Sequence, residues 1–366
     1  MGERRSRGAA RLKALGGAVL RSTWPVRRGR AESPAALLVL HDLLLGDTLM
    51  LAALLAALRA RYPSARILVT ASPAVVPLFS GRPYGVQAVP FTERDAAAIM
   101  QLPSARNCDI AFIPGDNRLA LTARALGARW IVAFADAVPR WKNWMVDESI
   151  AFPASPTALG DIFASLAGPI GALPYRVEDW PAPAVTPFER PRSPYAVLHV
   201  GARSSLRLWV PERWAEVAER LSRKGLLVVW TAGPGEERLV ERIDPSGHHV
   251  SYAGALDLAQ LWHLIAGATL MVTLDTGVAH LAKLTGTPTA CIFGPGSAPL
   301  LGPGTFWRAA PFMPVTVPDY PCRDQPFLFK RRLPWVRHCG RPLSECPRAR
   351  CMEAVGADDV LAALAQ

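Results

Sequence analysis

The chain has 366 residues, half of them hydrophobic and 19% charged, with a formal net charge of +11. This length favours two domains of about 100–200 residues each, and the apolar content excludes a wholly disordered chain. The best candidate for a membrane-spanning helix, residues 37–58, is interrupted by His41, Asp42 and Asp47. Because a span needs ~20 mainly apolar residues, the sequence predicts a soluble, cytoplasmic protein.

The chain opens with a basic leader, residues 1–34. Its first 30 residues hold nine arginines or lysines and a single acid, Glu3, so they carry +8 of the net charge. Leu12, Leu15 and Val19 have helical spacing beside arginines, and a short helix of this kind would lie on the anionic inner face of the cytoplasmic membrane. The alternative is a solvated leader. Since the rest of the chain carries only +3 and no nucleic-acid motif, we expect no nucleic-acid partner.

Residues 35–178 alternate short apolar runs with amphipathic stretches, which is typical of the strands and helices of a parallel α/β sheet. The expected strands are Ala36–Leu40, Arg66–Thr70, Asp109–Pro114 and Trp130–Phe134. A helix is expected between the first two, from near Asp47 through residue 63. Gly46 permits a tight turn before this helix. Asp47 either caps the helix or, at the carboxyl edge of the sheet, takes a proton from an attacking hydroxyl.

Residues 179–194 are rich in proline, which predicts a linker. The alternation then restarts in a second domain, residues 195–366. Its expected strands are Tyr195–Val200, Leu226–Thr231, Leu270–Leu274 and Thr289–Phe293, and its expected helices are Pro211–Lys224, Glu236–Ile243, Leu256–Ile265 and Thr276–Leu284. Two doubly wound parallel sheets would then face a cleft, and ligands of such sheets bind at the carboxyl ends of the strands.

The most informative segment follows the strand that ends at Leu274. Asp275, Thr276 and Gly277 are expected in the first turn of the next helix, where free backbone N–H groups and the helix dipole bind phosphate. His280 lies on the same helical face as Thr276. The alternative is structural, with Asp275 as a helix cap and His280 as a core residue whose hydrogen bonds are satisfied.

Two other loops at strand ends carry polar side chains. Ser204, Ser205 and Arg207 follow one strand, and two hydroxyls with a guanidinium suit a diphosphate. Glu236 follows another strand after two glycines. Its carboxylate either accepts hydrogen bonds from ribose hydroxyls or favours the start of the next helix. Together the three loops predict a nucleotide-diphosphate site.

Four of the six cysteines crowd into a basic, loop-like segment, residues 319–352: Cys322, Cys339, Cys346 and Cys351. Four thiols can hold a structural zinc or iron ion, although the spacing lacks the paired Cys-x-x-Cys of a common zinc site. Reduced thiols and disulfides are the other interpretations, and a cytosolic setting disfavours disulfides. Cys108 and Cys291 lie in or beside expected strands, so we expect them to be buried.

These motifs together resemble one known family. The matching segments are Gly46-Asp-Thr48, Arg207-Leu-Trp209, Gly233-Pro-Gly-Glu236, Asp275-Thr-Gly-Val-Ala-His280 and Phe293-Gly-Pro295. They resemble, in order, the motifs of family 9 glycosyltransferases, which are the heptosyltransferases of bacterial lipopolysaccharide assembly. The resemblance covers about residues 35–355. It implies the GT-B architecture, in which two Rossmann-like domains bind the acceptor mainly in the first and the nucleotide sugar mainly in the second.

The resemblance also implies site roles, which are taken here by position. It makes Asp47 the general base of an inverting transfer and Arg207 the counterpart of a diphosphate-binding lysine. The implied donor-binding turn comprises Asp275, Thr276, Gly277 and His280, with Glu236 near the nucleoside. The implied donor is ADP-heptose, and the implied acceptor is a lipopolysaccharide core or another glycan. The segment Arg207–Pro211 departs from the family's common Lys-x-Trp-Pro by an arginine and one extra residue.

The chain has no Asp-x-Asp pair, the usual carboxylate pair for a divalent metal, so we expect transfer without a required cofactor. Two other functions stay open. One is a GT-B transferase that uses another nucleotide sugar, such as a UDP- or GDP-hexose, and the other is a catalytically silent module that binds glycolipid. A dinucleotide dehydrogenase is disfavoured because no Gly-x-Gly-x-x-Gly follows an expected strand.

Overall fold

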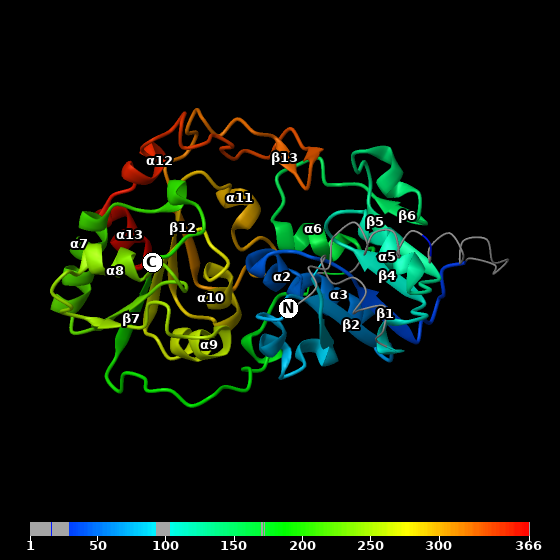
Figure 1. The fold of residues 1–366 in the computed structure, drawn as a ribbon, viewed down its shortest axis with the longest axis horizontal. Helices are drawn as coiled ribbons and strands as arrows, with labels where there is room; N and C mark the ends of the chain where they lie inside the picture. The colour runs from blue at the N-terminus through cyan, green and yellow to red at the C-terminus, as the bar shows by residue number, and fades with distance from the viewer. Residues whose placement is uncertain (1–15, 17–28, 93–102, 170, 172, 366) are drawn as a thin grey trace, which may run out of the picture.

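The computed structural model describes residue 16 and residues 29–92, 103–169, 171 and 173–365. Two lobes lie side by side, and each is built on a six-stranded parallel sheet covered by helices (Figure 1). This arrangement confirms the predicted α/β class with two doubly wound sheets. Most of the predicted basic leader, residues 1–34, lies outside the described residues. Its end is anchored, because Arg30 forms an ion pair with Glu148 at 2.5 Å.

The first sheet has the strand order β3-β2-β1-β4-β5-β6. Its strands are β1 (Ala36–Val39), β2 (Arg66–Ala71), β3 (Gln87–Pro90), β4 (Ile110–Ile113), β5 (Trp130–Phe134) and β6 (Glu148–Ile150). The chain leaves β1 toward β2 and later returns to its other side with β4. Such a reversal opens a crevice at the carboxyl ends of β1 and β4, where open α/β sheets bind their ligands.

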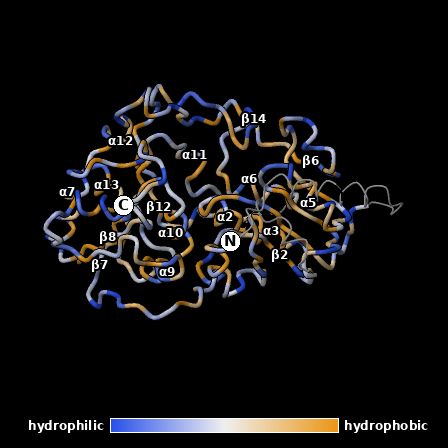
Figure 2. The backbone as a smooth tube through the Cα atoms, viewed as in Figure 1, coloured by the Kyte–Doolittle hydropathy of each residue, from blue (hydrophilic) through white to orange (hydrophobic). Residues whose placement is uncertain are grey.

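The helices of this lobe are α2 (Leu45–Met50), α3 (Ala52–Arg61), α5 (Leu119–Ala125) and α6 (Leu159–Ser165). The single long helix expected from Asp47 is therefore two helices divided at Leu51, and it starts two residues earlier than predicted. Every residue of α3 from Ala52 to Leu58 is buried. A helix that is apolar on all sides belongs in a core, and Figure 2 shows α3 as mainly hydrophobic.

The second sheet has the order β12-β11-β10-β7-β8-β9. Its strands are β7 (Tyr195–His199), β8 (Leu227–Thr231), β9 (Val250–Ser251), β10 (Leu270–Leu274), β11 (Thr289–Phe293) and β12 (Phe312–Thr316). Its helices are α7 (Pro211–Arg223), α8 (Glu237–Ile243), α9 (Leu258–Ala266), α10 (Ala279–Thr285), α11 (Ala298–Leu301), α12 (Arg350–Glu353) and α13 (Ala357–Ala363). Local signals set several helix starts. Pro211 opens α7, and the Asp257 carboxylate accepts a hydrogen bond from the Gln260 amide at 2.8 Å to cap α9.

Four strands of the two large sheets were not expected from the sequence: β3, β6, β9 and β12. All four are edge strands. An edge strand has one neighbour and partly exposed side chains, so its apolar pattern is weaker than that of a central strand. The burial patterns agree, since β3 and β6 each contain exposed residues.

The segments between the sheets join the two lobes. Residues 180–194, within the predicted linker 179–194, contain no helix or strand, and Trp180 anchors their start by donating from Nε1 to the Leu78 carbonyl at 2.9 Å. A short hairpin of β13 (Phe327–Leu328) and β14 (Arg331–Arg332) lies next to the first lobe (Figure 1). The predicted segment 319–352 is thus not confined to the second domain. Every helix in the described part of the chain is too short or too polar to cross a bilayer.

Candidate active site between the two lobes

Two glycine-containing turns, one from each lobe, touch where the two lobes meet. Gly46 lies in the first turn of α2, and Gly277 lies between β10 and α10. A Cβ added to Gly277 would be 2.9 Å from the Leu45 Cβ and 3.0 Å from the Gly46 nitrogen. A Cβ added to Gly46 would be 2.9 Å from Cδ2 of His280 and 3.2 Å from the Gly277 Cα. Because backbone meets backbone here, only glycine fits without a shift, and the turn of the first lobe directly adjoins that of the second.

Asp47 lies in the first turn of α2, next to this contact. It does not cap the helix, because the N-cap residue is Leu44 and no side chain caps this end. Its side chain is partly exposed. Burial of the carboxylate raises the pKa of Asp47 to about 6, the charge of Asp275 raises it further, and Arg207 lowers it. Asp47 therefore shares one electrostatic environment with two residues of the second lobe and has a pKa suited to a general base near neutral pH.

Asp275 lies in the turn after β10 rather than in a helix. The helix expected from Thr276 begins only at Ala279, and its N-cap residue is Val278, so the predicted position of Asp275, Thr276 and Gly277 in a first helical turn is wrong. Asp275 is 3% exposed, and its Oδ2 accepts no hydrogen bond within the described residues. Burial raises its pKa, while Arg207 opposes the shift.

Several polar atoms of this turn are buried without partners. Among the described residues, neither Thr276 Oγ1 nor His280 Nδ1 has a hydrogen-bond partner, and the amides of Thr276 and Gly277 make no backbone hydrogen bond. Burial lowers the pKa of His280 well below its usual value, so its imidazole is neutral. Buried polar groups are normally paired. A turn with this many unpaired groups is suited to a polar ligand, and His280 is not a core histidine with satisfied hydrogen bonds.

Arg207 connects the loop after β7 to the same turn. Its Nη1 donates to the Asp275 carbonyl at 2.6 Å and lies 3.5 Å from the Asp275 Oδ2. The side chain is still 39% exposed, so part of the guanidinium faces solvent and can bind an anion. Ser204 and Ser205, on the same loop, are exposed. Their predicted contact with a diphosphate stays a prediction.

The Glu236 carboxylate contacts two loops of the second lobe. Its Oε2 accepts a hydrogen bond from the Gly233 amide at 2.8 Å. A Cβ on Gly201 would be only 2.1 Å from the same oxygen, so the carboxylate packs against the loop after β7. Glu236 thus joins the loops after β7 and β8, and its predicted contact with the nucleoside stays a prediction.

Sequence reasoning missed Lys283, which lies one helical turn after His280. Lys283 is 1% exposed and donates from Nζ to the carbonyls of Leu301 and Gly302 at 2.5 and 2.9 Å. Burial lowers its pKa to about 7. By holding the end of α11, Lys283 supports the loop that carries Gly296, where a Cβ would be 2.0 Å from Oδ2 of Asp275. The only signal for Lys283 in the sequence was a lysine at a helical position where the pattern places buried residues.

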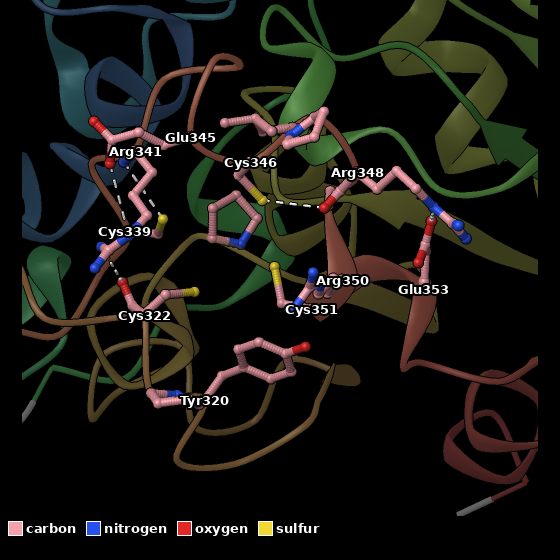
Figure 3. Close-up of a pocket in the computed structure, with 15 residues that line it drawn as sticks. Tyr320, Cys322, Cys339, Arg341, Glu345, Cys346, Arg348, Arg350, Cys351 and Glu353 are labelled. Atoms are coloured by element: carbon pink, nitrogen blue, oxygen red, sulfur yellow. Dashed lines mark hydrogen bonds and ion pairs between the residues drawn. The ribbon is translucent and has the colours of Figure 1, made fainter.

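The four clustered cysteines line one cavity of about 670 Å³ (Figure 3). All six cysteines of the chain are free, and Cys108 and Cys291 are buried as predicted. Burial and the neighbouring Cys339 thiol raise the pKa of Cys322. Within the described residues, no three His, Cys, Asp or Glu side chains already form a group that could hold a metal ion. Metal binding by Cys322, Cys339, Cys346 and Cys351 therefore stays a prediction.

Comparison with known proteins finds similarity to glycosyltransferases. A family model described as glycosyltransferase family 9 (heptosyltransferase) matches residues 178–311. Lipopolysaccharide heptosyltransferase 1 of Pseudomonas aeruginosa is 30% identical over 133 residues, which is 36% of this chain and 37% of that protein. Lipopolysaccharide heptosyltransferase 3 of Escherichia coli is 23% identical over 273 residues, or 68% of this chain and 79% of that protein. The first of these alignments thus spans little more than a third of its curated relative.

Solved structures share the fold along most of the chain. The E. coli ADP-heptose lipopolysaccharide heptosyltransferase II superposes with a TM-score of 0.66 at 19% identity, covering 90% of this chain and 97% of that one. The iron-containing dodecameric glycosyltransferase TibC of enterotoxigenic E. coli superposes with a TM-score of 0.55 at 15% identity, covering 92% and 77%. Together with the two facing sheets, these similarities show that the chain has the GT-B fold of the solved heptosyltransferases, and residues 178–311 are similar to the heptosyltransferases of glycosyltransferase family 9.

Proposed function

We propose that the protein is an inverting glycosyltransferase that transfers a heptose from ADP-heptose to a lipopolysaccharide core or another glycan. The observation that carries this proposal is the contact between the two turns. It puts Asp47 of the first lobe in the electrostatic environment of Asp275 and Arg207 of the second. A base on one side of a cleft and an anion site on the other are the two parts that a direct displacement needs.

In this mechanism Asp47 accepts the proton of an acceptor hydroxyl. The hydroxyl oxygen bonds to the anomeric carbon from the face opposite the diphosphate, while the bond from that carbon to the diphosphate oxygen breaks and ADP leaves. Negative charge grows on the leaving diphosphate. The exposed part of the Arg207 guanidinium and the unpaired amides and hydroxyl of the turn at Thr276 would stabilise it.

A donor comparison tests the proposal. Purified protein is incubated with ADP-heptose, UDP-hexose or GDP-hexose, with and without lipopolysaccharide core fragments, and nucleotide release is measured. We expect release from ADP-heptose that depends on the acceptor, and thermal stabilisation by ADP that exceeds stabilisation by UDP, because bound ligand raises apparent stability by mass action. Release from a UDP- or GDP-sugar instead would favour the other donor class, and binding of glycolipid without release from any donor would favour a silent module.

We also propose that Cys322, Cys339, Cys346 and Cys351 hold a structural zinc or iron ion. The support is that all four line one cavity and that thiolates are the preferred ligands of both metals. The ion would join the ends of the C-terminal segment and take no part in the transfer, for which no cofactor is proposed. The likeness to the iron-containing TibC adds a reason to test iron.

Metal analysis of protein purified without added metal decides this second proposal. We expect bound zinc or iron in the wild type and its loss in C339S, while C108S, a buried cysteine outside the cluster, keeps the metal. A folded wild-type protein free of metal would refute the site. Association of the basic leader with the inner face of the cytoplasmic membrane is a separate proposal, and co-sedimentation with anionic vesicles tests it.

A further inference from the structure

A long segment of the second lobe reaches across to the first. This segment, residues 317–349 between β12 and α12, is named the strap here. It passes from the second lobe toward the first and carries the β13–β14 hairpin to the neighbourhood of α6 and β6 (Figure 1). Its base is fixed to the second lobe, because Arg323 donates from Nε to the Gly294 carbonyl at 2.6 Å and the Cys339 amide donates to the Pro295 carbonyl at 2.8 Å.

The hairpin tip inserts one buried cation into the first lobe. Arg331 is 3% exposed. Its Nε donates to the Ala135 carbonyl at 2.6 Å, and its Nη2 donates to Oδ1 of Asn117 at 2.8 Å and to the Phe134 carbonyl at 3.2 Å. The guanidinium also lies 5.4 Å from the centre of the Phe152 ring. A planar guanidinium with five N–H donors can make all of these contacts at once, and a lysine cannot.

The partners of Arg331 lie on the edge of the sheet that carries the proposed base. Asn117 follows β4, and Phe134 and Ala135 end or follow β5, so the contacts are at the carboxyl edge of the first sheet. This edge continues into the turn that carries Asp47. Gly115 is the second residue after β4, and a Cβ added to it would be 3.1 Å from the Leu43 Cδ2. Leu43 lies four residues before Asp47. Arg331 therefore forms hydrogen bonds with the same edge of the first sheet that carries the turn with Asp47.

Other contacts join the lobes elsewhere and do not involve the strap tip. The Asp161 carboxylate accepts hydrogen bonds from the amides of Thr305 and Phe306 at 2.6 and 2.9 Å. The Tyr175 hydroxyl donates to the Leu284 carbonyl at 2.7 Å. These contacts hold the lobes together when the strap tip is released, so a change at Arg331 should alter the relative position of the lobes rather than separate them.

We propose that Arg331 is a positioning residue that fixes the carboxyl edge of the first sheet to the second lobe and so sets the distance between Asp47 and the donor turn. The residue touches neither turn directly. It acts through the edge that carries Asp47, and Trp335 reinforces it by donating from Nε1 to the Pro153 carbonyl at 2.9 Å. The kinetic part of this inference rests on the proposed transfer, whereas its geometric part does not.

The first experiment measures lobe geometry without substrate. Fluorescent non-natural residues replace exposed Ser64 in the first lobe and exposed Lys224 in the second, so that the native cysteines stay unlabelled. We expect one narrow distance distribution for the wild type and for R332Q, since Arg332 is an exposed neighbour on the same hairpin. We expect a broader or longer distribution for R331M and an intermediate one for R331K. A folded R331M with the wild-type distribution would overturn the proposal.

A milder variant covers the case in which R331M does not fold. W335F keeps an aromatic ring but removes the hydrogen bond to Pro153, so it should broaden the distribution less than R331M. An unchanged distribution in folded W335F, with R331M unfolded, would count against a positioning role for the strap.

The second experiment separates kcat from KM. We expect R331M to lower kcat by roughly 10- to 100-fold, because a misplacement of about 1 Å can cost about that much. The KM for the donor should stay near the wild-type value, since the donor turn belongs entirely to the second lobe. A raised donor KM with unchanged kcat would refute positioning of Asp47. If the wild type transfers nothing, the proposed function fails while the distance measurement still decides the role of Arg331.

Discussion

The two turns that meet between the lobes contain a glycine and an acid in opposite order. In the first lobe Gly46 precedes the acid, so Asp47 falls inside helix α2 with a partly exposed side chain. In the second lobe the acid precedes Gly277, so Asp275 is buried behind the turn and its carbonyl is held by Arg207. The difference teaches that the two acids are suited to different roles. The partly exposed Asp47 carboxylate can exchange protons, whereas the buried Asp275 supports the turn that we propose as an anion site.

The largest expected effect comes from removing the partly exposed acid, Asp47. Asp47→Asn keeps the shape but cannot accept a proton, and general-base catalysis typically contributes about 10²- to 10⁴-fold, so kcat should fall by that factor. Thermal stabilisation by ADP should stay unchanged, because the anion site is in the other lobe. D136N is the control, since Asp136 is exposed after β5 and has a positive φ that asparagine tolerates. If D47N turned over at the wild-type rate, Asp47 would not be the general base, and the proposed difference in role between Asp47 and Asp275 would be wrong.

A methyl group at the contact should have the next largest effect. Gly277→Ala places a Cβ 2.9 Å from the Leu45 Cβ and 3.0 Å from a backbone nitrogen, so the turns must move apart. A displacement of this kind should lower kcat/KM by about 100-fold. G171A is the matched control, because nothing lies within 4 Å of a Cβ there. If steady-state kinetics showed equal activity for both variants, the close contact of the turns would not matter for function.

The pH dependence tests the electrostatic link between the turns. The pKa of Asp47 is about 6, and only the ionised carboxylate can act as a base, so the rate should fall about tenfold per pH unit below that value. The charge of Asp275 raises this pKa and Arg207 lowers it. D275N should therefore move the acid limb of the kcat profile to lower pH, and R207M should move it to higher pH. An acid limb that neither variant moves would show that the turns are not coupled.

The raised pKa of Asp47 also determines how this residue changes the free energy of unfolding with pH. Since the pKa of Asp47 is raised above its unfolded value, the folded state favours the protonated form. The contribution of Asp47 to the free energy of unfolding is therefore fully present below the unfolded pKa and is lost as the pH rises through about 6.

The smallest expected effect concerns the buried hydroxyl of Thr276. Thr276→Val removes an oxygen that has no hydrogen-bond partner among the described residues, so the free protein should become slightly more stable. One hydrogen bond to the diphosphate would be lost, which should weaken ADP binding by about 2- to 10-fold. T285V is the control, because the Thr285 hydroxyl donates to the Ala282 carbonyl at 3.2 Å, and it should lower stability without changing ADP binding. Calorimetry showing a less stable free T276V protein would contradict the assignment of this hydroxyl to a ligand.

Local sequence was sufficient for the central strands. Trp130–Phe134, Leu270–Leu274 and Thr289–Phe293 are predicted with the bounds that the structure has, because a strand buried on both faces is apolar along its whole length. The turns of the proposed site were also predictable, since polar residues directly after such strands lie at the carboxyl edge of a parallel sheet. Edge strands were not predictable in this way, because their patterns are mixed.

Other features depend on residues far apart in the chain. The start of α10 at Ala279 rather than Thr276 places the proposed donor-binding residues in a turn, and no local pattern signals this shift. The contact between Gly46 and Gly277 joins residues separated by most of the chain, and the contact between Arg331 and Asn117 joins a C-terminal hairpin to the first sheet. By itself the sequence determined which side chains stand at strand ends, because that follows from hydrophobic periodicity. Only the tertiary structure decided which of them meet, because packing of two lobes sets distances that no short segment encodes.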